Sequence, residues 1–550
     1  MIKIEIDLIN IIKKALKETF PEISDKVADN ILLEIPKEKK FGDFSANIAM
    51  KLSRDLRKSP LDIAASIVKH VEKSDIIHDI KVEKPGFINF YISSKAVVGS
   101  LKDIIKEDVA FGRSSIGNGK KAQIEFVSAN PTGPLTVAHG RQAAIGDSLA
   151  RILKFCGYNV VREYYINDEG VQIQALGKSV KARLMETLGK ESEFPENGYK
   201  GGYIHEIAKK LKDSGVAEQA QASSVPLSEN FFMEYAVKEI MQTIIKDLED
   251  FGVHFDIWYS QKALARSGKV EKGIESLREK GFLYEQDSAT WFRSTEFGDD
   301  KDRVIIKSDG SYTYLTPDIA YHKEKFSQGY DKIVNIWGPD HHGYINRIKA
   351  ACQAMGYDKE KVFILIAQLV TLYREGKPVK MSTREGEFIT LREVMDEVGK
   401  DAARFFFIMR RTESHLDFDI ALAKAQTLDN PVYYIQYAHA RISSIIEFSK
   451  NAQPNLDNLA LLDKEQEINL IKTLIHYPKI IEAAAANLEP SILLSYLQDL
   501  AGFFHSYYNA YRIVTDDKPL TEARISLVHT VKKVLASGLD LLGVTALEKM

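Results

Sequence analysis

The sequence is poor in cysteine. Only Cys156 and Cys352 occur among 550 residues, and they form no Cys-x-x-Cys pair. A structural zinc site built on thiolates is therefore not expected. The first 20 residues read as an amphipathic helix of the mature fold, because Glu5 and Asp7 interrupt their apolar residues. With few cysteines and no export signal, we expect the reducing cytoplasm as the compartment.

Long apolar runs and an excess of charge are also missing. No apolar run reaches the roughly 18 residues that cross a membrane, so no membrane partner is expected. The chain has 74 basic and 77 acidic residues, a net charge of −3. Composition alone therefore does not predict a nucleic-acid partner, although a local basic surface can still bind phosphates. At this length, two to four domains are expected.

Neither of the two common phosphate-binding loops is present. No G-x-G-x-x-G follows a strand, and the sequence around Gly177 lacks the first glycine of the G-x-x-x-x-G-K-[ST] loop. Instead, residues 123–157 predict a strand, a turn-rich loop and then a helix with apolar residues at i, i+4, i+7 and i+8. In a parallel sheet, such a loop lies at the carboxyl ends of the strands, where ligands bind. The free N–H groups that open the helix attract phosphate.

The sequence of this unit, EFVSANPTGPLTVAHGR, resembles that of the arginyl-tRNA synthetases. Within it, Thr136 to His139 resembles the "HIGH" signature of class I synthetases. Thr136 replaces the first histidine of the signature, and Ala138 replaces its glycine. The resemblance implies that this loop binds ATP through Pro131, Gly133, Thr136, Ala138, His139 and Gly140.

Residues 380–384 read KMSTR and resemble the second class I signature, the "KMSKS" loop. When a carboxylate attacks the α-phosphate of ATP, lysines on such a loop stabilise the charge that moves onto pyrophosphate. The resemblance assigns ATP binding to Lys380, Met381 and Ser382, and catalysis to His139, Thr136, Lys380 and Ser382. Thr383 stands where the second lysine belongs. We hypothesise that Lys120 or Lys121 supplies the missing charge, because both lie one strand away from the ATP loop.

A third loop, residues 338–343, follows a predicted strand over 332–337 and reads GPDHHG. Adjacent residues rarely ligate one ion, so a dedicated metal site is not expected here. In the family, this loop lies by the adenosine and the amino acid, which implies ATP contacts for Gly338, Asp340, His341 and His342. Magnesium is expected to accompany ATP without a protein cage.

A pocket for arginine should offer acidic groups, because carboxylates bind the planar guanidinium as a fork. The candidates on the catalytic sheet are Glu125 and Asp318. Tyr314 can stack on the guanidinium, and Asn130 can hold the α-amino or carboxylate group. These positions match those that bind arginine in the family. The resemblance completes the set, which is Glu125, Ser128, Asn130, His139, Tyr314, Asp318 and His341.

Three domains are predicted. Residues 1–110 read as an α+β domain, 111–392 as a Rossmann-like doubly wound parallel sheet with an insertion at about 187–250, and 393–550 as an all-α bundle. The resemblance implies that the first domain contacts the corner of a tRNA and that the last binds the anticodon. Aromatic and basic groups suit such contacts. The candidates are Phe41, Phe44, Tyr437, Arg441, Asn509, Tyr511 and Arg512.

We therefore expect an arginine-tRNA ligase, monomeric as in the family, that uses ATP, L-arginine and tRNA(Arg). Three alternatives stay open. A synthetase for another amino acid would lack the paired acids Glu125 and Asp318. A synthetase-derived RNA-binding protein with an impaired site would explain Thr136, Ala138 and Thr383. A small-molecule nucleotidyltransferase would leave the large helical C-terminus unexplained.

Overall fold

The computed structural model describes residues 3–23, 31–36, 38–216, 227–379, 389–449 and 454–550. Its N-terminal domain is built on a four-stranded antiparallel sheet of order β1-β2-β4-β3. The strands are β1 (Leu33–Glu34), β2 (Phe44–Ala46), β3 (Ile77–Glu83) and β4 (Phe87–Ile92). The helices are α1 (Lys3–Thr19), α3 (Ile48–Leu56), α4 (Pro60–Lys69) and α5 (Ser94–Glu107).

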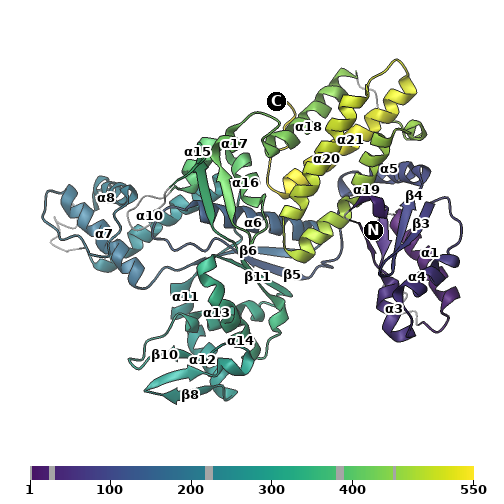
Figure 1. The fold of residues 1–550 in the computed structure, drawn as a ribbon. Helices are drawn as coiled ribbons and strands as arrows, with labels where there is room; N and C mark the ends of the chain where they lie inside the picture. The colour runs from purple at the N-terminus through teal and green to yellow at the C-terminus, as the bar shows by residue number, and fades with distance from the viewer. Residues whose placement is uncertain (1–2, 24–30, 37, 217–226, 380–388, 450–453) are drawn as a thin grey trace.

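A five-stranded, all-parallel sheet forms the centre of the molecule, as the strand pattern predicts (Figure 1). Its order is β12-β11-β5-β6-β7, so the chain leaves β5 toward one side for β6 and β7 and later returns on the other side with β11. This reversal between β5 and β11 is a topological switch point, where ligands bind at the carboxyl ends of the strands. The strands are β5 (Lys121–Glu125), β6 (Asn159–Ile166), β7 (Ile257–Ser260), β11 (Lys332–Trp337) and β12 (Val362–Ile366).

Two substructures extend from this sheet (Figure 1). Between β6 and β7 the chain forms a projecting helical extension of α7 (Val171–Thr187), α8 (Gly202–Asp213) and α10 (Glu229–Asp250). Between β7 and β11 it forms a separate antiparallel sheet of β8 (Leu283–Gln286), β9 (Ala289–Phe292) and β10 (Arg303–Ile306). Its helices are α11 (Gln261–Arg266), α12 (Lys269–Glu279) and α13 (Leu315–Ser327), and α14 (Ile345–Ala354) packs against α13.

The sequence predicted that the segment after residue 393 is helical throughout. The structure differs, because this segment contains a strand. β15 (Leu416–Asp419) pairs in parallel with β13 (Val370–Arg374), which also pairs with β14 (Lys377–Pro378). The predicted boundary at 392/393 falls inside α15 (Leu391–Val398), and a continuous helix crosses it. Next come α16 (Lys400–Ile408) and α17 (Ile420–Lys424). We propose that the C-terminal domain begins only at α18.

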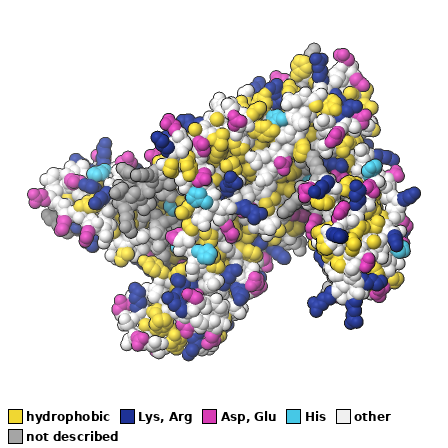
Figure 2. Space-filling view, viewed as in Figure 1, with side chains coloured by type: hydrophobic (Ala, Val, Ile, Leu, Met, Phe, Trp, Pro, Cys, Tyr) yellow, Lys and Arg dark blue, Asp and Glu magenta, His cyan; other side chains and the backbone are white. Residues whose placement is uncertain are grey.

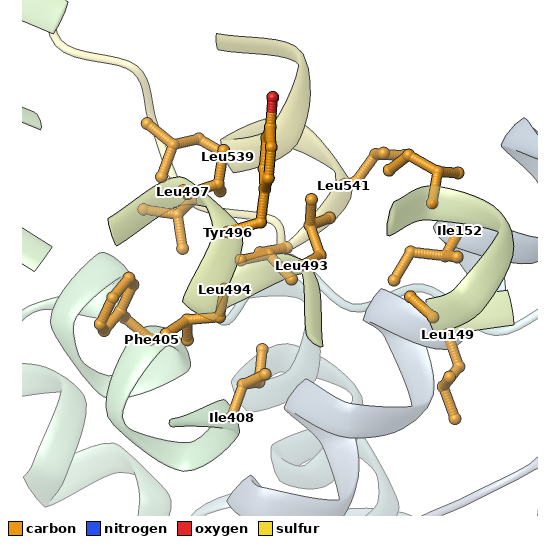
Figure 3. Close-up of a cluster of buried hydrophobic side chains, with 14 of the residues drawn as sticks. Leu149, Ile152, Phe405, Ile408, Leu493, Leu494, Tyr496, Leu497, Leu539 and Leu541 are labelled. Carbon is orange, nitrogen blue, oxygen red and sulfur yellow. The ribbon is translucent and has the colours of Figure 1, made fainter. Parts of the chain in front are cut away.

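The C-terminal bundle consists of α18 (Pro431–Phe448), α19 (Glu465–Asn487), α20 (Ser491–Ala510) and α21 (Lys518–Leu541). Its core continues into the catalytic domain. Figure 3 shows Leu149 and Ile152 of α6 (Val137–Phe155) in one apolar cluster with Phe405 of α16 and leucines of α20 and α21. Buried apolar contact of this extent ties the helix that opens at the predicted ATP loop to the bundle.

Among the described residues, no helix has the length and apolarity to span a membrane.

Candidate active site

The chain makes a strained turn directly after β5. Val127 has φ +68° and Ser128 has φ +38°, and a β-branched residue rarely adopts this left-handed conformation. Two hydrogen bonds hold the turn. The Ser128 hydroxyl donates to Glu125 Oε1 at 3.1 Å, and the backbone N–H of Tyr165 donates to Ser128 Oγ at 3.1 Å. Such strain persists only where the surroundings enforce it, as at functional sites, and here it fixes the Glu125 carboxylate.

The next turn begins α6 and orients His139. Thr136 is the N-cap residue, and its backbone N–H donates to His139 Nδ1 at 3.1 Å. Because Nδ1 accepts this bond, the imidazole proton is on Nε2, which is left to donate. Burial lowers the pKa of His139 to about 4, although the negative charge of Asp340 opposes this shift. His139 is therefore a neutral hydrogen-bond donor at the mouth of the helix, and the replacement Thr136 takes part in this arrangement.

The two glycines that flank the first signature, Gly133 and Gly140, have different surroundings. A methyl group at Gly140 would meet Leu391 Cδ1 at 2.7 Å and Phe407 at 3.0 Å, so this position has no room for a side chain and its glycine lets α6 pack closely. Gly133 lies beside Tyr203 of α8, whose hydroxyl donates to the backbone oxygen of Thr132 at 2.7 Å. The helical extension therefore contacts the predicted ATP loop. No motif in the sequence indicated Tyr203.

Lys380, Met381, Ser382 and Thr383 of the second signature lie outside the described residues. The flanks of this segment are described, and the flank that follows it contacts the first signature. On one side, β14 pairs with β13. On the other side, Thr390 forms a β-bridge with Thr136, and the N–H of Leu391 donates to the oxygen of Leu135 at 2.8 Å. The residues that follow the second signature in the chain therefore lie against the first signature.

The prediction that Lys120 or Lys121 supplies the missing charge is wrong. Both lie at the amino end of β5, where the N–H of Asn159, the first residue of β6, donates to Lys120 O at 2.9 Å. The ATP loop follows the opposite, carboxyl end. A strand of 5 residues separates the two ends by about 16 Å. These lysines are therefore neighbours of the loop along the chain but lie at the other edge of the sheet.

The loop after β11 lies at the same carboxyl edge as the first signature, because β11 pairs with β5 in parallel. A methyl group at Gly338 would lie 2.7 Å from Asp340 Oδ1, so the Asp340 side chain folds over this glycine. His341 Nε2 lies 3.5 Å from Asp340 Oδ2, and both side chains are exposed, as is His342. Within the described ranges, no three His, Cys, Asp or Glu side chains cluster in a way that could hold a metal ion.

A buried network surrounds Glu125. Lys325 of α13 donates to Glu125 Oε2 at 2.6 Å and to Asn335 Oδ1 at 2.8 Å, and all three side chains are buried. Burial acts to raise the pKa of Glu125, but the charge and hydrogen bond of Lys325 outweigh it, so the pKa lies below its usual value. Glu125 is therefore a fixed carboxylate. Sequence analysis did not select Lys325, which lies 200 positions away along the chain.

Asp318, one of the two predicted acids, also lies on α13 and has no such partner. Its carboxylate makes no hydrogen bond or ion pair with any described residue, whereas Glu125 does. Burial, with the negative charge of Glu125, raises the pKa of Asp318 to about 7, and Lys325 offsets only part of the rise. The site thus holds an unpaired carboxyl group beside a paired one, which a cationic ligand would complete.

Two other predicted arginine ligands, Tyr314 and Asn130, are exposed rather than buried with this pair. Tyr314 is 77% exposed and is the N-cap residue of α13, four positions before Asp318 of its first turn. The tyrosines whose phenol pKa is raised by burial and by the charge of Asp318 are Tyr165 and Tyr344, neither of which the sequence indicated. Asn130 is exposed. Its side chain donates to Gln172 at 2.8 Å and accepts from Asn167 at 3.2 Å.

The predicted tRNA contacts of the N-terminal domain are only partly accessible. Phe44 is 2% exposed and packs edge to face on His476 of α19, with ring centroids 5.8 Å apart. It is therefore a packing residue between domains, and its predicted stacking on RNA is wrong. Phe41 is half-buried, with Lys40 Nζ 4.8 Å from its ring centroid.

In the bundle, Tyr437 and Arg441 lie on one face of α18. Tyr437 stacks on Tyr433 with centroids 6.0 Å apart, and the Arg441 guanidinium lies 5.2 Å from the Tyr508 ring of α20. Beyond Tyr508, Asn509 and Arg512 are exposed and Tyr511 is half-buried. On the face shown in Figure 2, Lys and Arg side chains are mixed with Asp and Glu over every domain.

Comparison with known proteins agrees with this geometry. Residues 100–427 match the family model "tRNA synthetases class I (R), catalytic domain", residues 7–92 match "Arginyl tRNA synthetase N terminal domain", and residues 435–550 match "DALR anticodon binding domain". The doubly wound sheet, with the first signature at the opening of α6, is thus part of the catalytic domain of a class I aminoacyl-tRNA synthetase.

Near-full-length relatives narrow the class. The arginine–tRNA ligase of Geobacillus kaustophilus is 47% identical over 562 aligned residues, which cover 99% of this chain and 100% of the relative. The arginine–tRNA ligase of Bacillus subtilis is 46% identical, and the alignment covers 95% of this chain and 94% of the relative. The chain belongs to the arginyl-tRNA synthetase family. The solved Thermus thermophilus arginyl-tRNA synthetase shares the fold, with a TM-score of 0.77 at 22% identity over 99% of this chain and 100% of that one.

Proposed function

We propose that this protein activates L-arginine with ATP to arginyl-adenylate, releases pyrophosphate, and transfers arginine to the 3′-terminal adenosine of tRNA(Arg). The observation that carries the proposal is the pair of acids at the switch point, the fixed carboxylate of Glu125 and the unpaired Asp318. The names of the relatives, arginine–tRNA ligase, support the same activity.

In this proposal, the substrate guanidinium binds between Asp318 and Glu125. Asp318 offers a whole carboxylate for a two-pronged hydrogen bond, and Glu125 keeps spare lone pairs because each of its oxygens accepts one bond. Ser128 orients Glu125, while Asn130 and His341 at the rim would hold the α-amino and carboxylate groups. Tyr314, at the N-cap of α13, would stack on the guanidinium from the exposed side of the pocket.

ATP would lie across the opening of α6. His139 would donate from Nε2 to a phosphate oxygen, a role that its neutral state and fixed tautomer suit. Pro131, Gly133 and Ala138 would border the nucleotide, with the loop that contains Asp340 and His342 on the other side. Lys380 and Ser382 would stabilise the charge that develops on pyrophosphate. Mg²⁺ would arrive on the ATP phosphates, held mainly by phosphate and water oxygens.

The bundle would bind the anticodon. Tyr437 and Arg441 combine a stacking surface with a cation beside it, and the exposed Asn509 and Arg512 extend that surface to the end of α20. Two free, buried cysteines suit a cytoplasmic enzyme. We take the monomer as the working unit, which sedimentation of the purified protein will test.

The pocket is tested by replacing Asp318 with Ala and measuring arginine activation. Because the bound guanidinium would lose its main partner, we expect kcat/KM for arginine to fall. The fall should correspond to a loss of about 3–5 kcal/mol of transition-state binding energy, with the KM for ATP unchanged. Asp55→Asn, on an exposed position of α3, serves as the control. Normal arginine kinetics in the Asp318 variant would remove the pocket assignment.

A further inference from the structure

Tyr165 is the last but one residue of β6, at the carboxyl edge of the sheet beside the proposed arginine pocket. Its backbone N–H holds Ser128, which in turn holds Glu125. Its hydroxyl oxygen is buried and has no hydrogen-bond partner among the described residues. Buried hydroxyls are normally satisfied, because leaving one without a partner costs stability, so this group calls for an explanation.

Tyr165 is one of three tyrosines whose rings are in contact. Its ring centroid lies 6.0 Å from that of Tyr259 and 4.6 Å from that of Tyr321. The other two hydroxyls have partners, because Tyr259 donates to Glu324 and Tyr321 donates to Glu163. The ring of Tyr165 is thus fixed by stacking, while its hydroxyl is left unused.

The charges around this hydroxyl are carboxylates. After burial, the largest influences on the Tyr165 phenol are the negative charges of Asp318 and Glu125, and both raise its pKa. Asp318 is also the acid that has no hydrogen-bond or ion-pair partner among the described residues. The unused hydroxyl thus belongs to a residue whose backbone holds the Ser128–Glu125 pair, beside the acids of the proposed pocket. A ligand that satisfies both this hydroxyl and Asp318 must bring N–H donors and positive charge, which is the chemistry of a guanidinium.

We propose that Tyr165 is a further arginine-binding residue, whose hydroxyl oxygen accepts a hydrogen bond from the substrate guanidinium and whose O–H donates to the Asp318 carboxylate. This inference rests on the arginine pocket proposed above. Arginine would place one N–H on Tyr165, where an ammonium or a neutral side chain of other shape offers no matching planar set of donors. Because the ring is already stacked, little conformational entropy is lost on binding.

The test is Tyr165→Phe in the full-length protein, assayed by arginine-dependent aminoacylation. Removing one hydrogen bond to a charged ligand should raise the KM for arginine about tenfold or more. The KM for ATP should stay unchanged. Since the variant also removes an unsatisfied buried hydroxyl, its melting temperature without arginine should equal or exceed that of the wild type. A merely structural tyrosine would give the opposite change in melting temperature.

Tyr259→Phe is the matched control. It removes a hydroxyl from the same ring stack, but one that is bound to Glu324, and should leave the KM for arginine unchanged. An arginine KM of Tyr165→Phe equal to that of the wild type would overturn the inference. If Asp318→Ala lowers arginine activation while Tyr165→Phe does not, only the inference on Tyr165 fails. If neither does, the pocket itself fails.

A crystal structure of the wild type with arginine provides a readout that needs no variant. We expect the Tyr165 hydroxyl within hydrogen-bond distance of both the guanidinium and Asp318. A hydroxyl that still faces neither group in the complex would overturn the proposal.

Discussion

Asp318→Asn should stabilise the free protein at neutral pH while weakening its binding of arginine. Asp318 has a pKa of about 7 in the folded protein instead of its ordinary 3.8. At about 1.4 kcal/mol per pKa unit, ionising this carboxyl costs up to ~4 kcal/mol. Because the side chain keeps some contact with solvent, screening reduces the effect, and we expect about 2 kcal/mol.

The pH dependence follows from the direction of the shift. From about pH 4 to pH 7 the unfolded chain ionises this carboxyl while the folded chain does not, so the wild type loses stability as pH rises. Asparagine does not ionise, so the Asp318→Asn protein does not lose stability in this way. The melting temperature of Asp318→Asn should therefore match that of the wild type near pH 4, exceed it by several degrees at pH 8, and change little further above pH 7.

The assay is calorimetric melting of both proteins at pH 4.5 and pH 8, with and without saturating arginine. Arginine should raise the melting temperature of the wild type and have less effect on the variant. Asp55→Asn should behave as the wild type throughout. The reasoning is refuted if Asp318→Asn melts below the wild type at pH 8, or if the difference between the two is the same at both pH values. Either result would mean that Asp318 already has a partner.

The remaining predictions concern other parts of the molecule. Lys120→Ala should leave arginine-dependent pyrophosphate exchange unchanged, because this residue lies at the far edge of the sheet; a loss of exchange would place it in the site. Tyr437→Ala and Arg441→Ala should each weaken tRNA binding measured by filter assay. Arg441→Ala should also reduce the slope of log binding constant against log salt concentration by about 1. Phe44→Ala should instead destabilise the fold by about 3–5 kcal/mol in denaturant titration. The buried Arg404 of α16 forms an ion pair at 2.7 Å with Asp147, a buried residue of α6. Arg404→Met should cost about as much, because it leaves the buried Asp147 with one partner fewer, and a stable variant would show that this ion pair is dispensable.

The strand–loop–helix unit was predictable because the spacing of its apolar residues is a local property of the sequence. The apolar strand before Val127 and the helical period after Ala138 needed no knowledge of the rest of the chain. The acids Glu125 and Asp318 were proposed because a guanidinium pocket needs carboxylates and the family resemblance fixed their positions. The wrong assignment of Lys120 was avoidable. A residue just before a strand and a loop just after it lie at opposite edges of the sheet.

Other residues could not be found from the sequence, because only the folded chain brings them together. Lys325 reads as an ordinary helix lysine until α13 places it on Glu125. Tyr203 lies in a polar extension without a motif, yet its hydroxyl holds the ATP loop. Phe44 stands among lysines, as an RNA-stacking residue would, but docking of the N-terminal domain on α19 buries it. Each case depends on a contact between segments far apart in the chain.

The most direct test of the central claim is ATP–pyrophosphate exchange with each amino acid, in the presence and absence of an arginine-accepting tRNA. We predict exchange with arginine alone, stimulated by the tRNA and abolished by Asp318→Ala. Exchange with a different amino acid, or none with arginine under either condition while tRNA is still bound, would contradict the account.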